Sequence, residues 1–223
     1  MHQVNIHRRS FLKRTSLAGG GLMLSFLLPD FAIAKNEEND CEFFQPNAYL
    51  KIDKKGLVTL FVPKQEMGQG VNTSLPMIVA EELDADWKNV KIEIAPHGTL
   101  KPGESSTGGS NAVRGMWQPL RKAGATAKAM LIGAAAKMWD VKPEQCAADK
   151  GIVMNMVNMQ TITYGELVCD AAKMPIPENV TLKKIDEFKI IGKAEKKSNL
   201  KEIITGKAKY GIDVQLQIGR AHV

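Results

Sequence analysis

Apolar and polar residues alternate along residues 48–63, AYLKIDKKGLVTLFVP, on either side of the polar run DKKG at 53–56. An alternation of period two predicts half-buried strands, and a glycine in the turn can adopt the positive φ that a tight hairpin needs. We therefore predict a hairpin of two strands, which Pro63 ends. The run VKIEIAP at 90–96 alternates in the same way and predicts a third strand. Residues 35–46 are mostly polar, and we predict no regular structure there.

A helical period begins shortly after the hairpin. Thr73 or Ser74 can cap the amino end of this predicted helix, because their hydroxyls accept from backbone N–H groups. The apolar positions that share one face of the helix are Ile78, Val79, Leu83 and Trp87. The charged positions predict a solvated opposite face, which carries Glu81, Glu82, Asp84 and Asp86.

The second half of the chain contains two more predicted helices. An alanine-rich helix is predicted over 112–139, and its small side chains favour close packing. Thr163 and Glu166 have the spacing of a capping box, which predicts the start of a further helix. Short strands are predicted between these helices, at 145–149 and 152–157. Together these elements predict an α+β fold, in which helices pack on a mixed sheet.

The predicted organisation changes towards the end of the chain. Residues 175–193 are extended in pattern and punctuated by proline, which predicts a linker and a strand. A lysine-rich stretch at 193–200 marks a predicted domain boundary, so that the first domain covers 35–198. Residues 199–217 then begin a second domain, with its first strand predicted in YGIDVQLQ at 210–217.

The last residues, IGRAHV at 218–223, break the pattern before them. They are also what the DNA string ATCGGAAGAGCACACGTC encodes, which resembles the start of a common sequencing adapter. We therefore expect 218–223 to be an artefact, with the authentic sequence of this piece ending near Gln217 within a longer protein. The alternative is a natural terminus.

Residues 1–34 have the three regions of an export signal: a basic string RRSFLKR at 8–14, an apolar run at 17–28 and a small-x-small site ending at Ala34. The apolar run is short for a membrane span, and the alternatives are an uncleaved anchor or a buried helix. The arginine pair resembles the twin-arginine signal, which exports folded proteins that commonly carry an inserted cofactor. We expect cleavage after Ala34, a periplasmic protein, and membrane contact only through this signal.

The composition excludes some classes of function but does not identify one. The chain has 223 residues, 44% of them hydrophobic and 24% charged, as in ordinary globular proteins. Half of the net charge of +6 comes from residues 1–34, and the remainder is too scattered for a nucleic-acid interface. Cys41, Cys146 and Cys169 form no CxxC pair, which excludes a zinc ribbon or an iron–sulfur cluster built by this chain. At most one disulfide can form among them, and free thiols are the favoured interpretation.

Two glycine-rich stretches each precede a predicted helix: Gly68-Gln69-Gly70 and the string SSTGGSN at 105–111. Such a loop offers backbone N–H groups and the positive end of a helix dipole, which together suit an anion such as phosphate. Neither stretch is the dinucleotide fingerprint GxGxxG or a P-loop, so each alone is more typical of a plain turn. Two such loops in one domain predict a site for one extended, phosphorylated cofactor.

Other recognisable chemistry is absent from the sequence. It contains no HExxH, no GxSxG and no histidine–cysteine pairing that would indicate a nucleophile. Met154, Met156 and Met159 are interpreted as packing residues rather than metal ligands. We predict no metal site made of protein side chains.

The longest motifs resemble one family. MGQGVNTSLPMIVAEELDADWKNVKIEIAP at 67–96 resembles the first molybdopterin-binding segment of the xanthine dehydrogenase and aldehyde oxidase family, in the branch of isoquinoline 1-oxidoreductase large (beta) subunits. STGGSNAVRGMWQPLRKAGATAKAMLIGAAAKMW at 106–139 resembles that branch's second loop and long helix. TYGEL, LKKIDEFKIIGK and ITGKAKYGIDV follow in the same order, and the last resembles the opening strand of the family's hammerhead domain. The resemblance covers about 47–217.

The resemblance implies a molybdenum hydroxylase, which inserts a water-derived oxygen at an electron-poor carbon of an N-heterocycle or an aldehyde. The implied cofactor is a molybdenum–molybdopterin, in its cytosine dinucleotide form, whose dithiolene rather than the protein holds the metal. Electrons would pass to [2Fe-2S] clusters on a small iron–sulfur partner subunit, with a cytochrome c as a candidate later acceptor. A small-molecule substrate and no nucleic acid complete the expected partners.

By the same resemblance, the cofactor-binding residues are Gly68, Gln69 and Gly70 together with Gly108, Gly109, Ser110 and Asn111. The family's catalytic glutamate lies in a glycine-flanked loop near its far C-terminus. No residue of this chain is therefore expected to be catalytic, and the chain is expected to be inactive alone. A second hypothesis is an exported binding module without catalysis, and a third is a degenerate accessory chain of the same family.

Overall fold

The computed structural model describes residues 41–96, 98–100 and 104–215, all of which belong to the compact unit Cys41–Val223. The predicted export signal, the adapter-like last residues and the end of the strand predicted in YGIDVQLQ lie outside the described residues.

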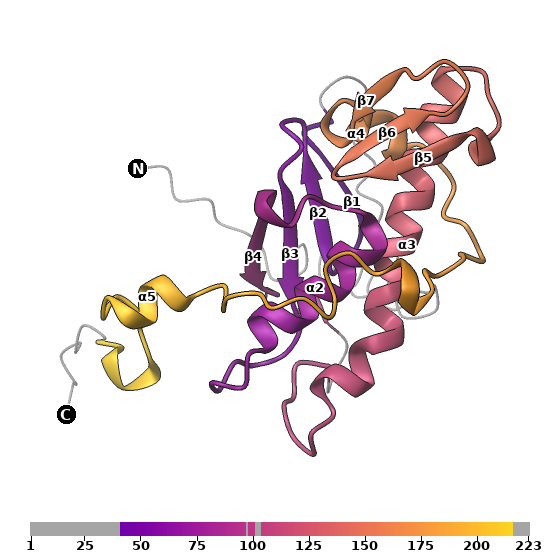
Figure 1. Cartoon of the computed structure of the whole chain (residues 1–223). Helices are drawn as coiled ribbons and strands as arrows, with labels where there is room; N and C mark the ends of the chain where they lie inside the picture. Colours follow the sequence, from indigo (N-terminus) through magenta and orange to yellow (C-terminus); the bar gives the residue numbers. More distant parts are fainter. Residues whose placement is uncertain (1–40, 97, 101–103, 216–223) are drawn as a thin grey trace, which may run out of the picture. The chain divides into compact units, whose positions relative to one another are not determined.

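A four-stranded mixed sheet is the centre of the fold (Figure 1). Its strands, in the order in which they pair, are β1 (Phe43–Asn47), β2 (Leu50–Asp53), β3 (Val58–Val62) and β4 (Val90–Ile94). β2 and β3 confirm the predicted hairpin: they are antiparallel, Leu50 lies opposite Leu60, and Gly56 in the turn has a φ of 79°. β4 confirms the third predicted strand and pairs parallel with β3, as the helical connection between them requires.

Strand β1 corrects the prediction that residues 35–46 lack regular structure. Phe44 is 1% exposed and lies opposite Ile52 of β2. The strand also contains Pro46, and its register shifts between Phe44 and Asn47. These irregularities interrupt the alternation that would have indicated a strand.

Three helices pack against the sheet and against one another (Figure 1). They are α2 (Val71–Leu83), α3 (Ala112–Met138) and α4 (Tyr164–Ala172). The alternate strand residues buried in the core include Leu50, Ile52, Val58, Leu60 and Val62. The Tyr164 hydroxyl donates to the Leu83 carbonyl at 2.6 Å and ties α4 to the end of α2. The predicted α+β fold, a mixed sheet with packed helices, is confirmed, and no helix in the described residues is long and apolar enough to cross a membrane.

The elements after α3 largely follow the sequence prediction. A turn of 3-10 helix, η2 (Pro143–Gln145), leads into a second sheet of β5 (Cys146–Asp149), β6 (Ile152–Asn155) and β7 (Thr161–Thr163). β5 and β6 confirm the two predicted short strands. The capping box of α4 is also confirmed: Thr163 Oγ1 accepts from the Glu166 N–H at 3.3 Å, and Glu166 Oε2 accepts from the Thr163 N–H at 2.9 Å.

The amino end of α2 differs from the prediction. The helix begins at Val71, and Gly70, in the left-handed conformation, is its cap residue. Thr73, a predicted cap, instead lies in the first turn, where its Oγ1 accepts from the Ser198 N–H at 2.9 Å. Trp87, predicted to share the apolar helix face, lies beyond the helix in the 3-10 turn η1 (Trp87–Asn89). The loop before the helix, rather than a threonine inside it, therefore sets the start of α2.

The prediction of a solvated acidic face on α2 is wrong for three of its four residues. Glu81 and Glu82 are 0% exposed, and Asp84 is also buried. Each of these carboxylates has a cationic partner: Lys183 with Glu81 at 2.8 Å, Arg121 with Glu82 at 2.6 Å and Lys128 with Asp84 at 3.0 Å. Buried carboxylates are tolerated when they are paired and hydrogen-bonded, and these partners come from distant parts of the chain.

Residues 175–193 form no strand, contrary to the prediction, and contain the 3-10 turn η3 (Ile185–Glu187). We call residues 183–191 the strap. Three consecutive backbone N–H groups of the strap donate to Oε2 of Glu81: Lys189 at 3.0 Å, Ile190 at 2.6 Å and Ile191 at 3.0 Å. Because a buried carboxylate satisfies these donors, this part of the strap is held without pairing to a sheet.

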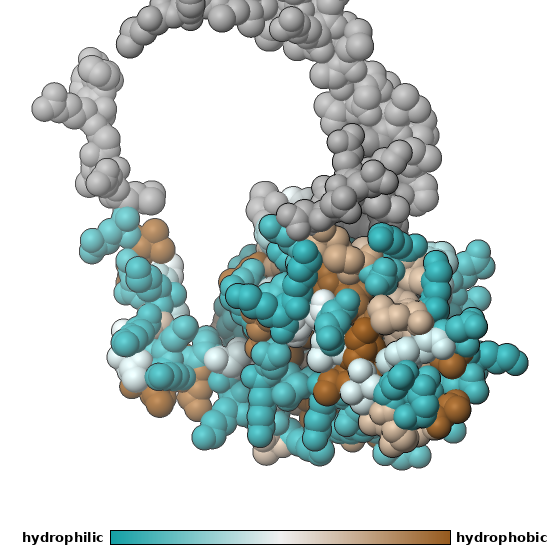
Figure 2. Space-filling model, turned by 90° about the horizontal axis from the view of Figure 1, so that it is seen from above, coloured by the Kyte–Doolittle hydropathy of each residue, from teal (hydrophilic) through white to brown (hydrophobic). Residues whose placement is uncertain are grey.

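The described chain ends with α5 (Leu200–Ile204) and the 3-10 turn η4 (Gly211–Asp213). The strand predicted in YGIDVQLQ is therefore wrong for 210–215, and Ile212 is 94% exposed. A strand needs a paired neighbour, and none of the described strands pairs with these residues. The division into 35–198 and 199–217 stays a prediction. Figure 2 shows a face on which hydrophilic side chains surround small apolar patches.

Candidate functional site

The residues that lead into the first predicted glycine-rich loop lie against the second loop. Lys64 Nζ donates to the Ser106 carbonyl at 2.8 Å. The Gln65 N–H donates to Thr107 Oγ1 at 3.0 Å, and the Thr107 hydroxyl contacts the Gln65 carbonyl at 3.3 Å. The structure thus brings Gly68-Gln69-Gly70 and the second loop, 104–111, into one region, although sequence reasoning did not single out Lys64.

The first loop has a backbone that only glycine adopts readily. Gly68 has a φ of 100° and Gly70 a φ of 88°, both in the left-handed half of conformational space. No atom lies within 4 Å of a Cβ built on either residue, so the loop is open on that side. A side chain at either position would strain the backbone and would project into the space that a ligand against this loop needs.

Glu66 determines the conformation of the first loop. Its carboxylate accepts from the N–H groups of Gly68 at 2.8 Å, Gly70 at 2.9 Å and Asn72 at 3.0 Å. Burial alone would raise the pKa of Glu66, but these three hydrogen bonds outweigh it and hold the pKa below its ordinary value. The amino terminus of α2 therefore already holds an anion, which belongs to the chain itself. An acidic residue shortly before a GxG and a helix was the sequence signal for this role, and sequence reasoning missed it.

Gln69 uses its amide to close the same loop. Its Oε1 accepts from the Met67 N–H at 2.6 Å, and its Nε2 donates to the Gln65 carbonyl at 2.9 Å. A glutamine amide has two donor hydrogens and two acceptor lone pairs, so one of each remains for a ligand. A contact between Gln69 and a cofactor stays a prediction.

The second loop is exposed and ends at the amino terminus of α3. Gly109 and Ser110 have φ values of 58° and 53°, and Asn111 caps α3 without a side-chain hydrogen bond. Among the described residues, no side chain accepts from the first backbone N–H groups of α3. Unlike the first loop, the second therefore keeps helix-terminal donors available for an external acceptor.

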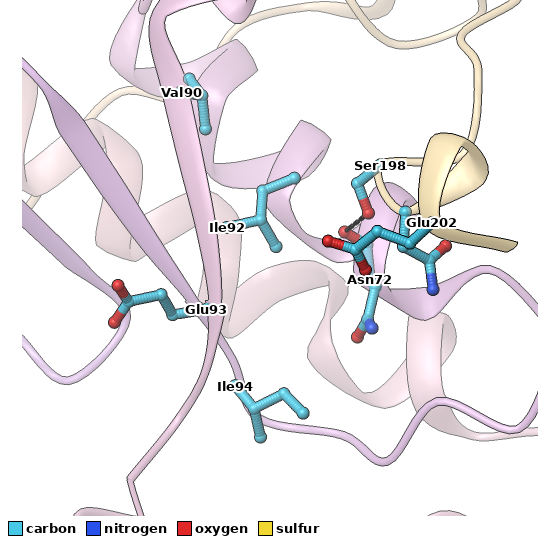
Figure 3. A pocket seen from close by; sticks show the side chains of 8 residues that line it. Asn72, Val90, Ile92, Glu93, Ile94, Ser198 and Glu202 are labelled. Carbon is cyan, nitrogen blue, oxygen red and sulfur yellow. Dashed lines mark hydrogen bonds between the residues drawn. The ribbon is translucent and has the colours of Figure 1, made fainter. Parts of the chain in front are cut away.

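The hollow nearest the start of α2 has the wrong lining for a phosphate (Figure 3). It measures about 310 Å³ and lies between the free edge of β4 and the segment that begins α5. Figure 3 shows Ser198 and Glu202 facing Asn72 across from Ile92. Two carboxylates and no cationic side chain line the hollow, so it does not favour an anionic ligand.

The cysteines provide no reactive centre. All three are free thiols in the described residues, as the favoured interpretation has it. Burial and the neighbouring Cys169 raise the pKa of Cys41 to about 11, and burial raises the pKa of Cys146. Both of these thiols are therefore protonated at neutral pH. In the described ranges, no group of three or more His, Cys, Asp or Glu side chains is placed to hold a metal ion.

Comparison with known proteins settles what kind of domain carries these loops. Residues 21–218 match the model of the molybdopterin cofactor-binding domain family. The chain belongs to this family. The two loops are thus a candidate cofactor site within a molybdopterin-binding domain.

Three curated relatives of this molybdopterin-binding domain are similar to the chain. It is 30% identical over 213 residues to the beta subunit of isoquinoline 1-oxidoreductase from Brevundimonas diminuta, covering 77% of this chain and 27% of the relative. It is 31% identical over 232 residues to the membrane-bound aldehyde dehydrogenase (pyrroloquinoline-quinone) of Gluconacetobacter polyoxogenes, covering 96% and 28%. It is 29% identical over 169 residues to a subunit of nicotinate dehydrogenase from Pseudomonas putida, covering 75% and 14%. The chain thus spans 27% and 28% of the first two relatives.

Solved structures resemble only part of the molybdopterin-binding domain. Quinoline 2-oxidoreductase from Pseudomonas putida 86 has a TM-score of 0.45 and 22% identity, covering 56% of this chain and 16% of that chain. The reconstituted CO dehydrogenase from Oligotropha carboxidovorans has a TM-score of 0.44 and 24% identity, covering 53% and 15%. Both likenesses are too partial to place a residue of this chain.

The loop residues fit a phosphorylated pterin in three respects. A Cβ built on Gly68 or Gly70 has no atom within 4 Å, so the loop leaves open space there. The first turn of α3 presents unused backbone donors. In addition, Oδ1 of Asn72, in the first turn of α2, is buried without a hydrogen-bond partner. Buried polar atoms normally have a partner, so an orphaned acceptor beside the loop is consistent with a missing donor. The predicted contacts of Gly68, Gln69, Gly70, Gly108, Gly109, Ser110 and Asn111 with the cofactor stay predictions.

Proposed function

We propose that the chain is the N-terminal part of the molybdopterin-binding catalytic subunit of an exported molybdenum hydroxylase. The observation that carries the proposal is the contact between the residues that lead into the first glycine loop and the second loop, through Lys64 with Ser106 and Gln65 with Thr107, in a chain of the molybdopterin-binding family. Two loops that lie in one region can hold different parts of one extended cofactor.

The proposed reaction oxidises an N-heterocycle or an aldehyde with oxygen derived from water. Its support is the relatives' names, two of which name a nitrogen heterocycle and one an aldehyde. When bound, the molybdenum–molybdopterin, proposed in its cytosine dinucleotide form, supplies the two-electron chemistry. The loop residues would bind and orient that group: the glycines permit close approach, and the α3 terminus offers donors.

The proposed assembly follows from the same relatives. Two of them are named as subunits, which supports a separate iron–sulfur subunit carrying the [2Fe-2S] clusters. A cytochrome c is the proposed later acceptor of the electrons. The twin-arginine string in residues 1–34 supports export of the folded protein to the periplasm, with cleavage after Ala34.

Replacing Gly68 and Gly70 by valine is expected to remove most of the molybdenum from the full-length protein. A Cβ strains both residues at their positive φ and projects into the open side of the loop. The measurement is molybdenum and pterin per protein chain, by elemental analysis and pterin fluorescence, after expression in a host that makes the cofactor.

Gly151→Val is the matched control. Gly151 has a φ of 78° in a turn between β5 and β6, also with nothing within 4 Å of a built Cβ. Like each single replacement in the loop, it strains one positive-φ backbone position, and it is expected to keep the cofactor. Equal cofactor content in the loop variant and this control would contradict the proposed site. A wild-type protein without molybdenum would favour the binding-module or degenerate-chain hypothesis instead.

A further inference from the structure

Lys64 is a buried cation that sits between the two glycine loops. Lys64 is 6% exposed. It lies in the segment between strand β3 and the first glycine loop. Its ammonium donates to the Ser106 carbonyl at 2.8 Å. Within the described ranges, no carboxylate lies close enough to pair with it.

Arg121, the other buried cation of the described residues, and the half-buried Lys183 do have carboxylate partners. Arg121 lies 2.6 Å from Glu82, and Lys183 lies 2.8 Å from Glu81. An ammonium has three donor hydrogens, and one carbonyl accounts for only one of those of Lys64. Buried charges in proteins are normally paired with an opposite charge. Lys64 is buried, but no carboxylate of the described residues pairs with it.

The neighbouring charges indicate where an anion could enter. The amino terminus of α2 is already filled by the carboxylate of Glu66. Lys197 Nζ donates to the Gly68 carbonyl at 2.8 Å and places a second positive charge at the first loop. An external oxyanion therefore finds its free donors at Lys64 and at the second loop, rather than at the start of α2.

We propose that Lys64 binds a phosphate or diphosphate group of the ligand held between the loops, and so acts as its charge partner. This inference rests on the proposed function for the identity of the ligand, which is a phosphorylated organic cofactor. A phosphate oxygen accepts charge-assisted hydrogen bonds from an ammonium, and the bridge to Ser106 fixes the ammonium against the second loop. Lys64 would then join the two halves of the site through the ligand as well as through the protein.

The test measures inorganic pyrophosphate binding to the cofactor-free full-length protein by calorimetry. Lys64→Met, which keeps the length and removes the charge, is expected to weaken binding about tenfold or more. Lys64→Arg keeps a cation and is expected to bind close to the wild-type affinity. Lys55→Met removes an exposed lysine in the β2–β3 turn and is expected to change nothing. Thermal midpoints without pyrophosphate show that each variant is folded.

The same variants are then expressed with the cofactor pathway and analysed for pterin and molybdenum. Lys64→Met is expected to carry several-fold less of both than Lys55→Met. Unchanged pyrophosphate affinity or unchanged cofactor content in Lys64→Met would overturn the assignment of Lys64. These outcomes are distinct from a failure of the proposed function, which would appear as a wild-type protein lacking molybdenum.

Discussion

Replacing Glu81 by glutamine is expected to destabilise the protein by about 3 kcal/mol, as measured by urea unfolding, because breaking a buried charge pair costs on this order. Glu81 is 0% exposed and accepts from Lys183 through Oε1 and from three strap N–H groups through Oε2. Both of its oxygens face donors. Whichever way a glutamine amide is turned, its NH₂ group meets one of these donors and an acceptor is lost.

The free energy of unfolding is expected to depend on pH because of the same carboxylate. Burial alone would raise the pKa of Glu81, but Lys183 and the N–H groups of Ile191, Lys189 and Ile190 outweigh it, and the pKa lies below the ordinary 4.5. A carboxylate whose pKa is lowered by folding stabilises the protein above its unfolded pKa, and the stability is lost as the pH falls through the folded pKa. The wild type should therefore lose stability below about pH 4.5, and Glu81→Gln should lose less over that range.

Glu93→Gln is the control for charge removal alone. Glu93 pairs with Lys91 at 2.6 Å, but both side chains are substantially exposed. Its loss is expected to cost at most about 1 kcal/mol, as for surface ion pairs. If Glu81→Gln lowered the free energy of unfolding no more than Glu93→Gln does, the buried carboxylate would not hold the strap against α2.

Gly124→Ala in α3 is expected to destabilise the protein by about 1–3 kcal/mol through overpacking. A Cβ there would lie 2.5 Å from the Val79 carbonyl oxygen and 3.0 Å from Cβ of Glu82. Neither atom is the end of a flexible side chain, so α2 and α3 would have to separate. The measurement is the free energy of unfolding in urea.

The same helix supplies the opposite control. At Gly115, the nearest atom to a built Cβ is the Cβ of Asn111, at 4.0 Å. Gly115→Ala is therefore expected to stabilise the protein by up to about 1 kcal/mol, through helix propensity alone. A destabilisation at Gly115 as large as that at Gly124 would show that the contact of Gly124 with α2 is not what matters.

Local patterns predicted the elements whose stabilising contacts are local. The hairpin of β2 and β3 was visible from its alternation and Gly56, and the start of α4 from the Thr163–Glu166 capping box. β1 was missed because Pro46 and a register shift break its pattern. Element type thus followed from the sequence wherever the signal was regular.

Long-range partners explain the larger errors. The carboxylates of α2 were interpreted as solvated because a helix pattern contains no information about Lys183, a residue 102 positions from Glu81 in the chain. A strand was predicted within residues 175–193 because their pattern is extended, and that pattern does not show which group accepts from the backbone donors. Once Glu81 accepts them, an extended but unpaired segment is stable.

The candidate site also combines features that the sequence shows with features that depend on long-range contacts. Its glycines were visible because a bare backbone before a helix is a sequence feature. The contact was not visible, since Lys64 meets Ser106 and Gln65 meets Thr107, each across 42 positions of sequence separation. Glu66 was overlooked although it precedes the first glycine closely, because its role appears only when the loop folds back on it.

The most direct test of the central claim is an experimental structure of the cofactor-loaded full-length protein. The account predicts density for one molybdopterin that contacts both Gly68–Gly70 and Gly108–Asn111, with a phosphate group beside Lys64. A cofactor that touches neither loop would contradict it.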